Sequence, residues 1–196
     1  MKKIFLCFLL LFSLNVFAAD PPASKATGIF LAFGVGPRLP VGDFSNTSEL
    51  GYGIGIEVSY TDNEFLPVFL FASVGFEQYP GAQRFYQESA YSNLSTNSIP
   101  LNVGVRYYFS PLLEQIVLLI PLIEVSASFT YFQVLHEFKI DSDLSNFKTE
   151  TIKYGITAGA GISMFLMEII AAYHYVQNNQ FVSFDLRVRI PLFVNL

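Results

Sequence analysis

Apolar and polar residues alternate with a period of two along most of this chain. In residues 51–61 the even positions are apolar or aromatic, while the odd positions are small or polar. Such a period places successive side chains on opposite faces of a β-strand. Eight segments share the pattern: residues 29–36, 51–61, 68–77, 98–107, 123–131, 154–163, 168–175 and 182–190. The sequence therefore predicts an all-β chain of eight strands, each with one apolar face.

The composition of the two faces indicates which side meets water. A soluble barrel buries its apolar face and exposes many long charged side chains, but here the second face carries mostly glycine and serine. That composition suits a narrow polar interior surrounded by lipid. Each segment has about the nine to eleven residues that a tilted strand needs to cross a bilayer. We predict an eight-stranded antiparallel up-and-down transmembrane β-barrel, with a soluble lipocalin-like barrel as the alternative fold.

The connections alternate in length, which assigns the two ends of the barrel. Long, polar connections are expected at residues 40–50, 80–96 and 139–150, and short ones at residues 62–64, 110–114 and around Leu166. Long extracellular loops and short periplasmic turns are typical of outer-membrane barrels. Only residues 177–180 are short where a long loop is expected. An even number of strands places both termini on the periplasmic side.

The N-terminus has the pattern of a secretory signal. Lys2 and Lys3 precede an apolar run, and Val16-Phe17-Ala18 forms a cleavage site of small-residue type. We expect a signal peptide at residues 1–18, a short periplasmic segment at 19–27 and the barrel at 28–196. Cys7 is the one cysteine of the chain and lies in this signal. The mature protein would therefore contain no disulfide, catalytic thiolate or cysteine-ligated metal.

Charge and hydropathy argue against a nucleic-acid-binding protein and against a helical membrane protein. Of eleven basic side chains, Lys2 and Lys3 belong to the signal, so nine remain beside sixteen acidic ones. Without a basic patch, we expect no binding of nucleic acid. After the signal, no uninterrupted apolar stretch reaches the roughly 20 residues of a spanning helix. A membrane location therefore requires strands.

Ionisable residues recur on the face that is predicted to line the lumen. Unpaired charges in such an interior cost several kcal/mol each, so we expect them to form a salt-bridged network that fills the lumen. An eight-stranded barrel is just wide enough for its own side chains, which argues against a general diffusion porin. The predicted lumenal charge network comprises Glu57, Glu77, Arg106, Glu124, Asp185, Arg187 and Arg189.

No catalytic, cofactor or metal site is predicted. His174 is the one histidine in a predicted strand, and we expect it to make hydrogen bonds in the lumen. Its context, His174-Tyr175-Val176, lacks the serine of the His-x-Ser motif of outer-membrane lipid A deacylases. Asp141-Ser142-Asp143 begins like a calcium loop but lacks the glycine and the terminal glutamate, so a solvated acidic loop is the preferred interpretation.

Taken together, the signal, the eight alternating segments and the C-terminal stretch from Arg189 to Leu196 resemble the small outer-membrane barrels of the outer membrane protein X, outer membrane protein W and OmpA-barrel type. The resemblance covers residues 28–196. Members of that family usually end on an aromatic residue, which the barrel-assembly machinery reads, whereas this chain ends on Leu196. We expect Pro191 to interrupt the last strand, and Leu192, Val194 and Leu196 to share the lipid face.

The resemblance implies a protein of the cell outer membrane of a Gram-negative bacterium. Our first hypothesis is a non-enzymatic barrel with an envelope structural or surface-interaction role, possibly within a larger assembly, whose contact surfaces are residues 80–96 and 139–150. A narrow, porin-like channel for small or apolar solutes is the alternative, and a lipid-modifying enzyme is the third. Expected partners are outer-membrane lipid and lipopolysaccharide, the barrel-assembly machinery and a protein bound through the extracellular loops.

Overall fold

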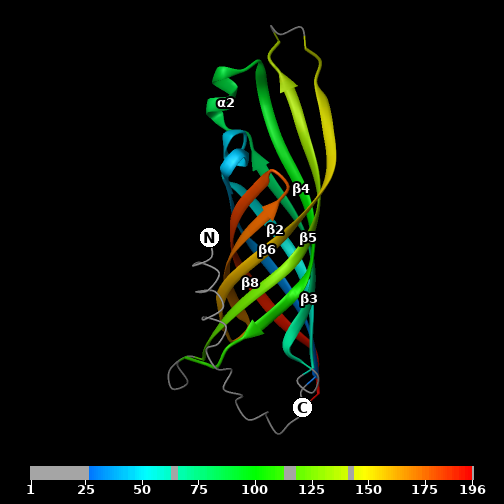
Figure 1. Cartoon of the computed structure of the whole chain (residues 1–196), viewed down its shortest axis with the longest axis vertical. Helices are drawn as coiled ribbons and strands as arrows, with labels where there is room; N and C mark the ends of the chain where they lie inside the picture. The colour runs from blue at the N-terminus through cyan, green and yellow to red at the C-terminus, as the bar shows by residue number, and fades with distance from the viewer. Residues whose placement is uncertain (1–26, 63–65, 113–117, 141–143, 196) are drawn as a thin grey trace, which may run out of the picture.

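Eight antiparallel strands close into one barrel in the computed structural model, which describes residues 27–62, 66–112, 118–140 and 144–195. Each strand pairs with its neighbours in sequence, and β1 pairs with β8 to close the ring (Figure 1). The strands are β1 (Thr27–Val41), β2 (Gly51–Asp62), β3 (Leu66–Pro80), β4 (Tyr91–Tyr108), β5 (Leu119–Phe138), β6 (Phe147–Met164), β7 (Met167–Val176) and β8 (Asn179–Asn195). The predicted fold class is confirmed.

Several expectations concern residues outside the described ranges. They are the signal peptide, the segment at residues 19–26, the core of the turn at residues 62–64, the Asp141-Ser142-Asp143 loop and Leu196. Within the described ranges, no helix combines the length and the apolar character that a bilayer crossing requires.

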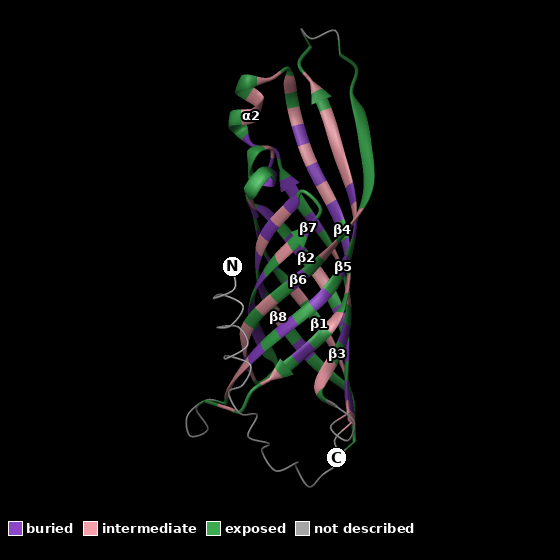
Figure 2. Ribbon diagram, in the orientation of Figure 1, coloured by how far each residue is buried: buried purple, intermediate pink, exposed green. Residues whose placement is uncertain are grey.

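The two faces of the wall have opposite chemistry, as the stripes of burial along each strand show (Figure 2). Ile54, Val103 and Leu186 point outward with 59%, 52% and 41% of their surface exposed, whereas Arg106 is completely buried inside. This is the reverse of a water-soluble barrel, and only hydrocarbon makes such an outer face favourable. Closure of the sheet pairs the backbone groups without leaving an edge in the bilayer, so the chain is a transmembrane β-barrel.

The strands are not of equal length, which corrects the expectation of about nine to eleven residues each. β4, β5 and β6 have 18, 20 and 18 residues. Residues 91–96 and 147–150, which lie in the two segments predicted as loops (80–96 and 139–150), are therefore strand. Together the upper parts of β4, β5 and β6 form a three-stranded sheet that stands above the rest of the barrel, and we call this sheet the extension (Figure 1).

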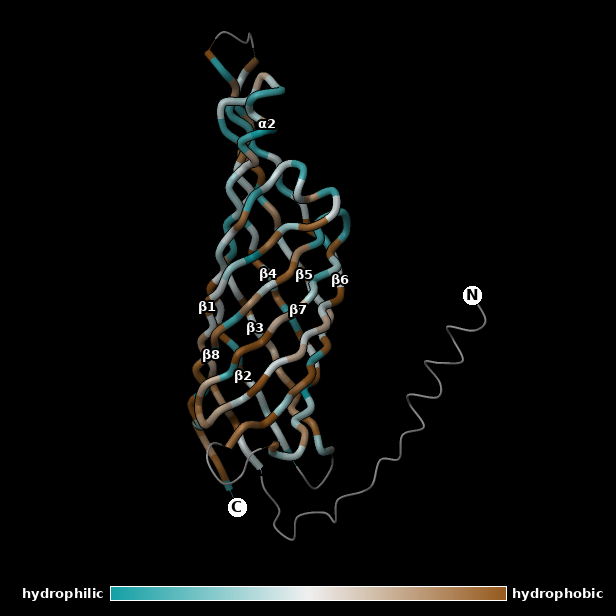
Figure 3. Tube along the Cα trace, turned by 90° about the vertical axis from the view of Figure 1, so that its left-hand side faces the viewer, coloured by the Kyte–Doolittle hydropathy of each residue, from teal (hydrophilic) through white to brown (hydrophobic). Residues whose placement is uncertain are grey.

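A single cross-strand row marks where the extension leaves the apolar belt. Asn97 pairs with Gln133, and Gln133 pairs with Glu150. Directly below this row the outward residues of the three strands are Ile99, Tyr131 and Ile152, and the outward residues further down are also apolar. Above the row, β6 carries the charged residue Lys148. The polar residues concentrate at this end of the molecule (Figure 3). The extension thus begins where the hydrocarbon ends.

At the opposite end, which we call the short-turn end, the connections differ in length, and the ten residues that separate β4 from β5 exceed the short connection predicted at residues 110–114. β6 and β7 are joined by Phe165 and Leu166, and Phe165 adopts a positive φ of 53°. At the extended end, η1 (Gly42–Asn46) follows β1, and α2 (Gln83–Glu88) lies between β3 and β4. The β7–β8 hairpin turns through Gln177 and Asn178, the latter with a φ of 60°. This hairpin is the one short connection at the extended end.

Pro191 does not end the last strand, contrary to our expectation. β8 continues to Asn195, and its pairing with β1 shifts by one residue, so that Phe30 lies opposite Pro191 and Ile29 opposite Phe193. A bulge accommodates the proline, which has no N–H to donate to the ladder. Because of this shift Phe193, rather than Leu192, lies opposite the outward-facing Ile29.

Candidate functional site

The lumen contains two groups of ionisable side chains, stacked along the barrel axis. All seven residues of the predicted network lie there, and the structure adds Arg38 and Glu168. The group nearer the short-turn end, which we call the Arg106 cluster, comprises Glu57, Arg106, Glu124, Glu168, Arg187 and Arg189. The group nearer the extended end, which we call the Arg38 cluster, comprises Arg38, Glu77 and Asp185.

The Arg106 cluster is built on strand register. Arg106 of β4 lies directly opposite Glu124 of β5, and Glu168 of β7 lies opposite Arg187 of β8. Arg106 donates from Nη1 and Nη2 to the two carboxylate oxygens of Glu57, at 2.7 and 2.8 Å. It also donates from Nε and Nη2 to Glu124, at 2.8 and 2.6 Å. Such a two-pronged guanidinium–carboxylate contact is among the strongest polar contacts in proteins.

Two further arginines complete this cluster. Arg187 donates to Glu57 and Glu124 at 3.1 to 3.2 Å. Arg189 donates to Glu57 at 3.2 Å and to Glu168 at 3.1 Å. Three carboxylates thus face three guanidinium groups, and the cluster is formally neutral. Because an uncompensated buried charge costs several kcal/mol, this balance is what permits so many charges inside a narrow barrel.

The Arg38 cluster bridges β1, β3 and β8. Arg38 donates from Nε to Glu77 at 2.8 Å, and its Nη1 lies 2.8 Å from Asp185. The second oxygen of Glu77 accepts from the hydroxyls of Tyr79 and Ser98, both at 2.9 Å. Asp185 and Arg187, 3.9 Å apart, link this cluster to the Arg106 cluster.

Small residues on the inner face make room for these long side chains. A Cβ on Gly53 would lie 2.6 Å from the guanidinium carbon of Arg38, and one on Gly34 would lie 3.1 Å from Cγ of Arg187. A Cβ on Gly159 would approach Cγ of Glu124 to 3.1 Å. These glycines of the small, polar face therefore leave the room that the charged side chains of the network occupy.

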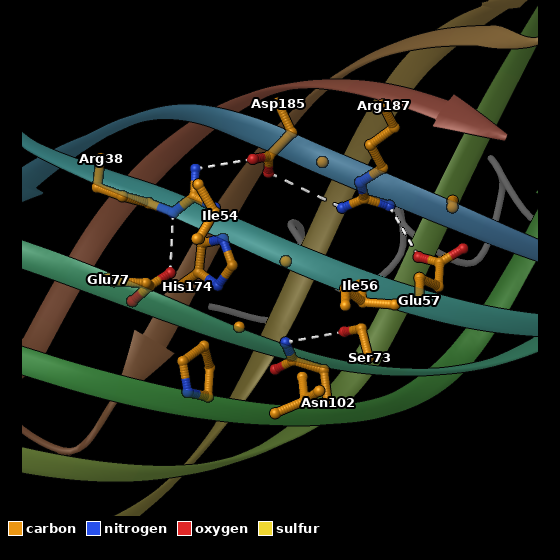
Figure 4. A pocket seen from close by; sticks show the side chains of 16 residues that line it. Arg38, Ile54, Ile56, Glu57, Ser73, Glu77, Asn102, His174, Asp185 and Arg187 are labelled. Carbon is orange, nitrogen blue, oxygen red and sulfur yellow. Dashed lines mark hydrogen bonds and ion pairs between the residues drawn. The ribbon is translucent and has the colours of Figure 1, made fainter.

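A cavity of about 70 Å³ lies between the two clusters (Figure 4). Its polar lining includes Arg38, Asp185 and Arg187, together with Ser73 and Asn102. Asn102 donates to Ser73 at 3.3 Å, while its buried carbonyl oxygen has no protein partner among the described residues. A polar cavity of this size has room for a few water molecules, which would satisfy that oxygen.

Aromatic and aliphatic residues close the lumen on both sides of the clusters. Toward the extended end lies a buried cluster of Phe44, Tyr79, Phe132, Val176 and Phe181. Toward the short-turn end, the ring of Phe69 contacts those of Phe30 and Tyr108, and the centroids of the three rings lie 5.6 to 5.9 Å from the guanidinium carbon of Arg189. Phe71 also lies in the lumen, where its ring centroid is 4.8 Å from the guanidinium carbon of Arg106.

His174 lies in the lumen between β6 and β8. Its Nε2 is 2.9 Å from Oγ of Ser183, its Nδ1 is 3.0 Å from Oγ1 of Thr157, and its ring stacks on Phe181. Ser183 is completely buried beneath the aromatic cluster. Both imidazole nitrogens are therefore engaged in hydrogen bonds within a closed interior, far from the lipid face.

Two members of the network escaped the sequence reasoning. Arg38 continues the inward alternation of Ala32, Gly34 and Gly36, but the predicted segment ended before it because two prolines flank the residue. Glu168 opens the seventh predicted segment (residues 168–175) and points inward, but it is not a member of the predicted network. If the alternation of inward and outward positions is continued past Gly36, Arg38 falls on the inward face.

Neither a protein-family model nor a curated protein matches this sequence. Solved structures similar to the chain include Neisserial surface protein A, with 16% identity, a TM-score of 0.45 and coverage of 85% of this chain and 99% of the other. Ail of Yersinia pestis, in complex with the heparin analogue sucrose octasulfate, has 11% identity, a TM-score of 0.46 and the same coverage. The N-terminal β-barrel domain of Pseudomonas aeruginosa OprF has 12% identity, a TM-score of 0.43 and coverage of 84% and 99%.

Proposed function

We propose that this transmembrane β-barrel resides in the bacterial outer membrane and acts as a non-enzymatic platform that displays the extension at the cell surface. The observation that carries the proposal is the combination of a lumen filled by ion pairs with three strands that continue beyond the apolar belt. A charge-filled, closed lumen has no room for solute flow, and a long rigid sheet raised above the membrane serves contact with other molecules.

The partners follow from the surfaces. Lipid and lipopolysaccharide cover the apolar outer face, and the barrel-assembly machinery inserts the chain. A protein partner contacts the extension and α2, which include parts of the predicted contact segments at residues 80–96 and 139–150.

A pull-down from detergent-solubilised outer membranes tests this role. The matched control replaces residues 134–149 with an Asn-Gly turn, which joins Gln133 to its cross-strand partner Glu150 and leaves the apolar belt intact. A partner retained by the full chain and lost by the trimmed chain supports the proposal. An identical set of bound proteins for both chains contradicts it.

A narrow channel is the second candidate, favoured by the polar cavity between the two clusters. Conduction would require the Asp185–Arg187 contact and the aromatic cluster to move aside. In planar bilayers we expect no steady single-channel currents from the folded protein, and such currents would favour the channel instead.

An enzymatic role is disfavoured by the position of His174 and Ser183, which lie beneath the aromatic cluster and away from the lipid face. Mass spectrometry of lipid A from cells with and without the protein should give identical spectra. A protein-dependent change in acylation would contradict this assignment.

A further inference from the structure

One edge of β6 has no neighbouring strand above the β7–β8 hairpin. β6 pairs with β5 along its whole length, but it pairs with β7 only from Gly155 onward. The hairpin turns at Gln177 and Asn178, well below the upper end of β6 (Figure 1). Within the described ranges, this edge therefore faces the surroundings of the barrel, and we call it the open edge.

One hydrogen bond shows which backbone groups point to the open edge. The carbonyl of Tyr154 accepts from the N–H of Gln177 at 3.3 Å, so the backbone groups of Tyr154 point to the β7 side. Backbone direction alternates along a strand, and the pairing of β6 with β5 runs without a register shift. Ile152 and Glu150 therefore also direct their N–H and C=O groups to this side, where no described residue pairs with them.

Ile152 lies at the depth where hydrocarbon gives way to lipid head groups. It pairs with Tyr131 in the row directly below Gln133 and Glu150, which marks the end of the apolar belt. Tyr154, two residues further down, points outward with 56% of its surface exposed, and such tyrosines are typical of the membrane interface. Hydrocarbon offers no partner for a backbone N–H, so the groups beside Ile152 that can pair with it are lipid heads and water.

A cation without a counter-ion stands next to the open edge. The ammonium of Lys153 donates to Oδ1 of Asn179 at 2.8 Å and lies 5.3 Å from the centroid of the Phe132 ring. Lys153 is half-buried, and none of the ion pairs in the described part of the chain includes it. Asn179 directly follows the hairpin turn, so the ammonium lies just behind this turn. Of its three N–H donors, two remain for a ligand.

The carboxylate of Glu150 is directed away from the open edge. Its Oε1 accepts from Nε2 of Gln133 at 3.3 Å, on the β5 side. Glu150 also lies on the outer face of β6, whereas Lys153 lies on the inner face. The open edge at Ile152 thus combines an unpaired backbone donor with a neighbouring positive charge, a combination that suits an anion.

We propose that the open edge of β6 binds the phosphate group of a membrane lipid, which accepts from the N–H of Ile152 and from the ammonium of Lys153. Phosphate is the acceptor that fits, because hydrogen bonds with an ionised donor and acceptor are stronger than neutral ones. The acyl chains continue down the apolar outer face past Tyr154. This inference goes beyond the proposed function, since it requires only a bilayer around the barrel and not a surface partner.

Native mass spectrometry of the barrel in detergent with dioleoyl phosphatidic acid tests the site. Dioleoylglycerol, which has the same chains but no phosphate, is the matched lipid and should not remain bound. Lys153→Gln should weaken binding of phosphatidic acid about fivefold, the contribution of one basic residue near an anionic lipid. Lys148→Gln, on the same strand but on the outer face above the row, is the control and should leave binding unchanged. Equal retention of the two lipids, or equal weakening by both variants, overturns the proposal.

Replacement of Ile152 tests the backbone donor. Ile152→Pro removes the N–H, and proline is tolerated in a strand where the N–H faces an open edge. This variant should bind phosphatidic acid about tenfold more weakly, whereas Ile152→Val, which keeps the N–H, should bind as the unchanged chain does. Unchanged binding by Ile152→Pro overturns the proposal.

Hydrogen exchange covers the case in which Ile152→Pro does not fold, as judged by heat-modifiable migration on gels. In the unchanged chain, phosphatidic acid should slow exchange at the Ile152 amide about tenfold, because the amide then donates to phosphate. The Thr151 amide, which points toward β5, should exchange at the same rate with and without the lipid. No slowing at Ile152 overturns the proposal.

Inorganic phosphate at the same concentration separates a lipid site from a site for free anions. It should not displace phosphatidic acid, because it lacks the acyl chains that lie on the apolar face. Displacement by inorganic phosphate overturns the assignment to a lipid. These measurements use the isolated barrel, so their outcome is independent of the pull-down that tests the proposed function.

Discussion

Replacement of Arg106 tests whether the charges of the Arg106 cluster compensate one another. Arg106 is completely buried and makes four hydrogen bonds to Glu57 and Glu124. In Arg106→Met, the cluster has three carboxylates against two guanidinium groups, so one negative charge lies buried without compensation. Removal of one partner from a buried ion pair costs about 3–5 kcal/mol. We expect the lower end, about 3 kcal/mol, because Arg187 and Arg189 still contact the two carboxylates.

The measurement is urea unfolding of the protein in detergent or lipid, followed by circular dichroism and by the gel shift of the folded barrel, since the chain contains no tryptophan. Arg84→Met is the matched control, because Arg84 forms an ion pair with Glu88 in which both side chains are mostly exposed. Exposed pairs contribute about 0–1 kcal/mol. The double variant Arg106→Met/Glu124→Met restores charge balance and should recover part of the loss, with a coupling of about 1–3 kcal/mol. If Arg106→Met unfolds within 1 kcal/mol of Arg84→Met, the reasoning about buried charge is refuted.

Three further predictions concern a glycine beside the charge network, the hydrogen bonds between Tyr86 and Leu94, and the titration of His136 in the extension. Gly53→Ala should destabilise the barrel by about 1–3 kcal/mol, because its Cβ would displace the Arg38 guanidinium; Gly55→Ala, whose nearest neighbour would lie 3.4 Å away, should be nearly neutral in the same urea titration. The Tyr86 hydroxyl on α2 accepts from the N–H of Leu94 in β4 and donates to its carbonyl. Tyr86→Phe removes both hydrogen bonds, so hydrogen exchange at the Leu94 amide should accelerate by the equivalent of about 1 kcal/mol, and unchanged exchange would contradict this contact. Desolvation lowers the pKa of His136, which lies in the extension above the apolar belt. Because the folded-state pKa is depressed, the contribution of His136 to stability is present above its ordinary pKa of about 6.5 and is lost as the pH falls through the folded value. Titration of His136 by NMR checks the direction, and a pKa at or above the ordinary value would refute it.

Most of the fold could be predicted from the local alternation of apolar and polar residues. A period of two depends only on neighbouring residues, so the eight strands, their apolar faces and the inward direction of Glu57, Arg106 and Arg187 could be predicted from the sequence. The mostly glycine and serine composition of the second face then indicated lipid on the outside. The prediction ended where alternation became irregular, because Pro37 and Pro40 obscured the inward position of Arg38.

Register and closure belong to the tertiary structure alone. Whether Arg106 meets Glu57 depends on how β2, β3 and β4 are staggered, since the two residues are 49 positions apart. The bulge in β8 opposite Ile29 and Phe30 likewise shifts the pairing of β8 with β1 by a residue. The length of the extension was equally hidden, since its polar outward residues look like a loop while cross-strand pairing makes them strand. The sequence determined which face of each strand meets lipid. Only the closed sheet decided which charges share a cluster, because those contacts join residues that no local pattern connects.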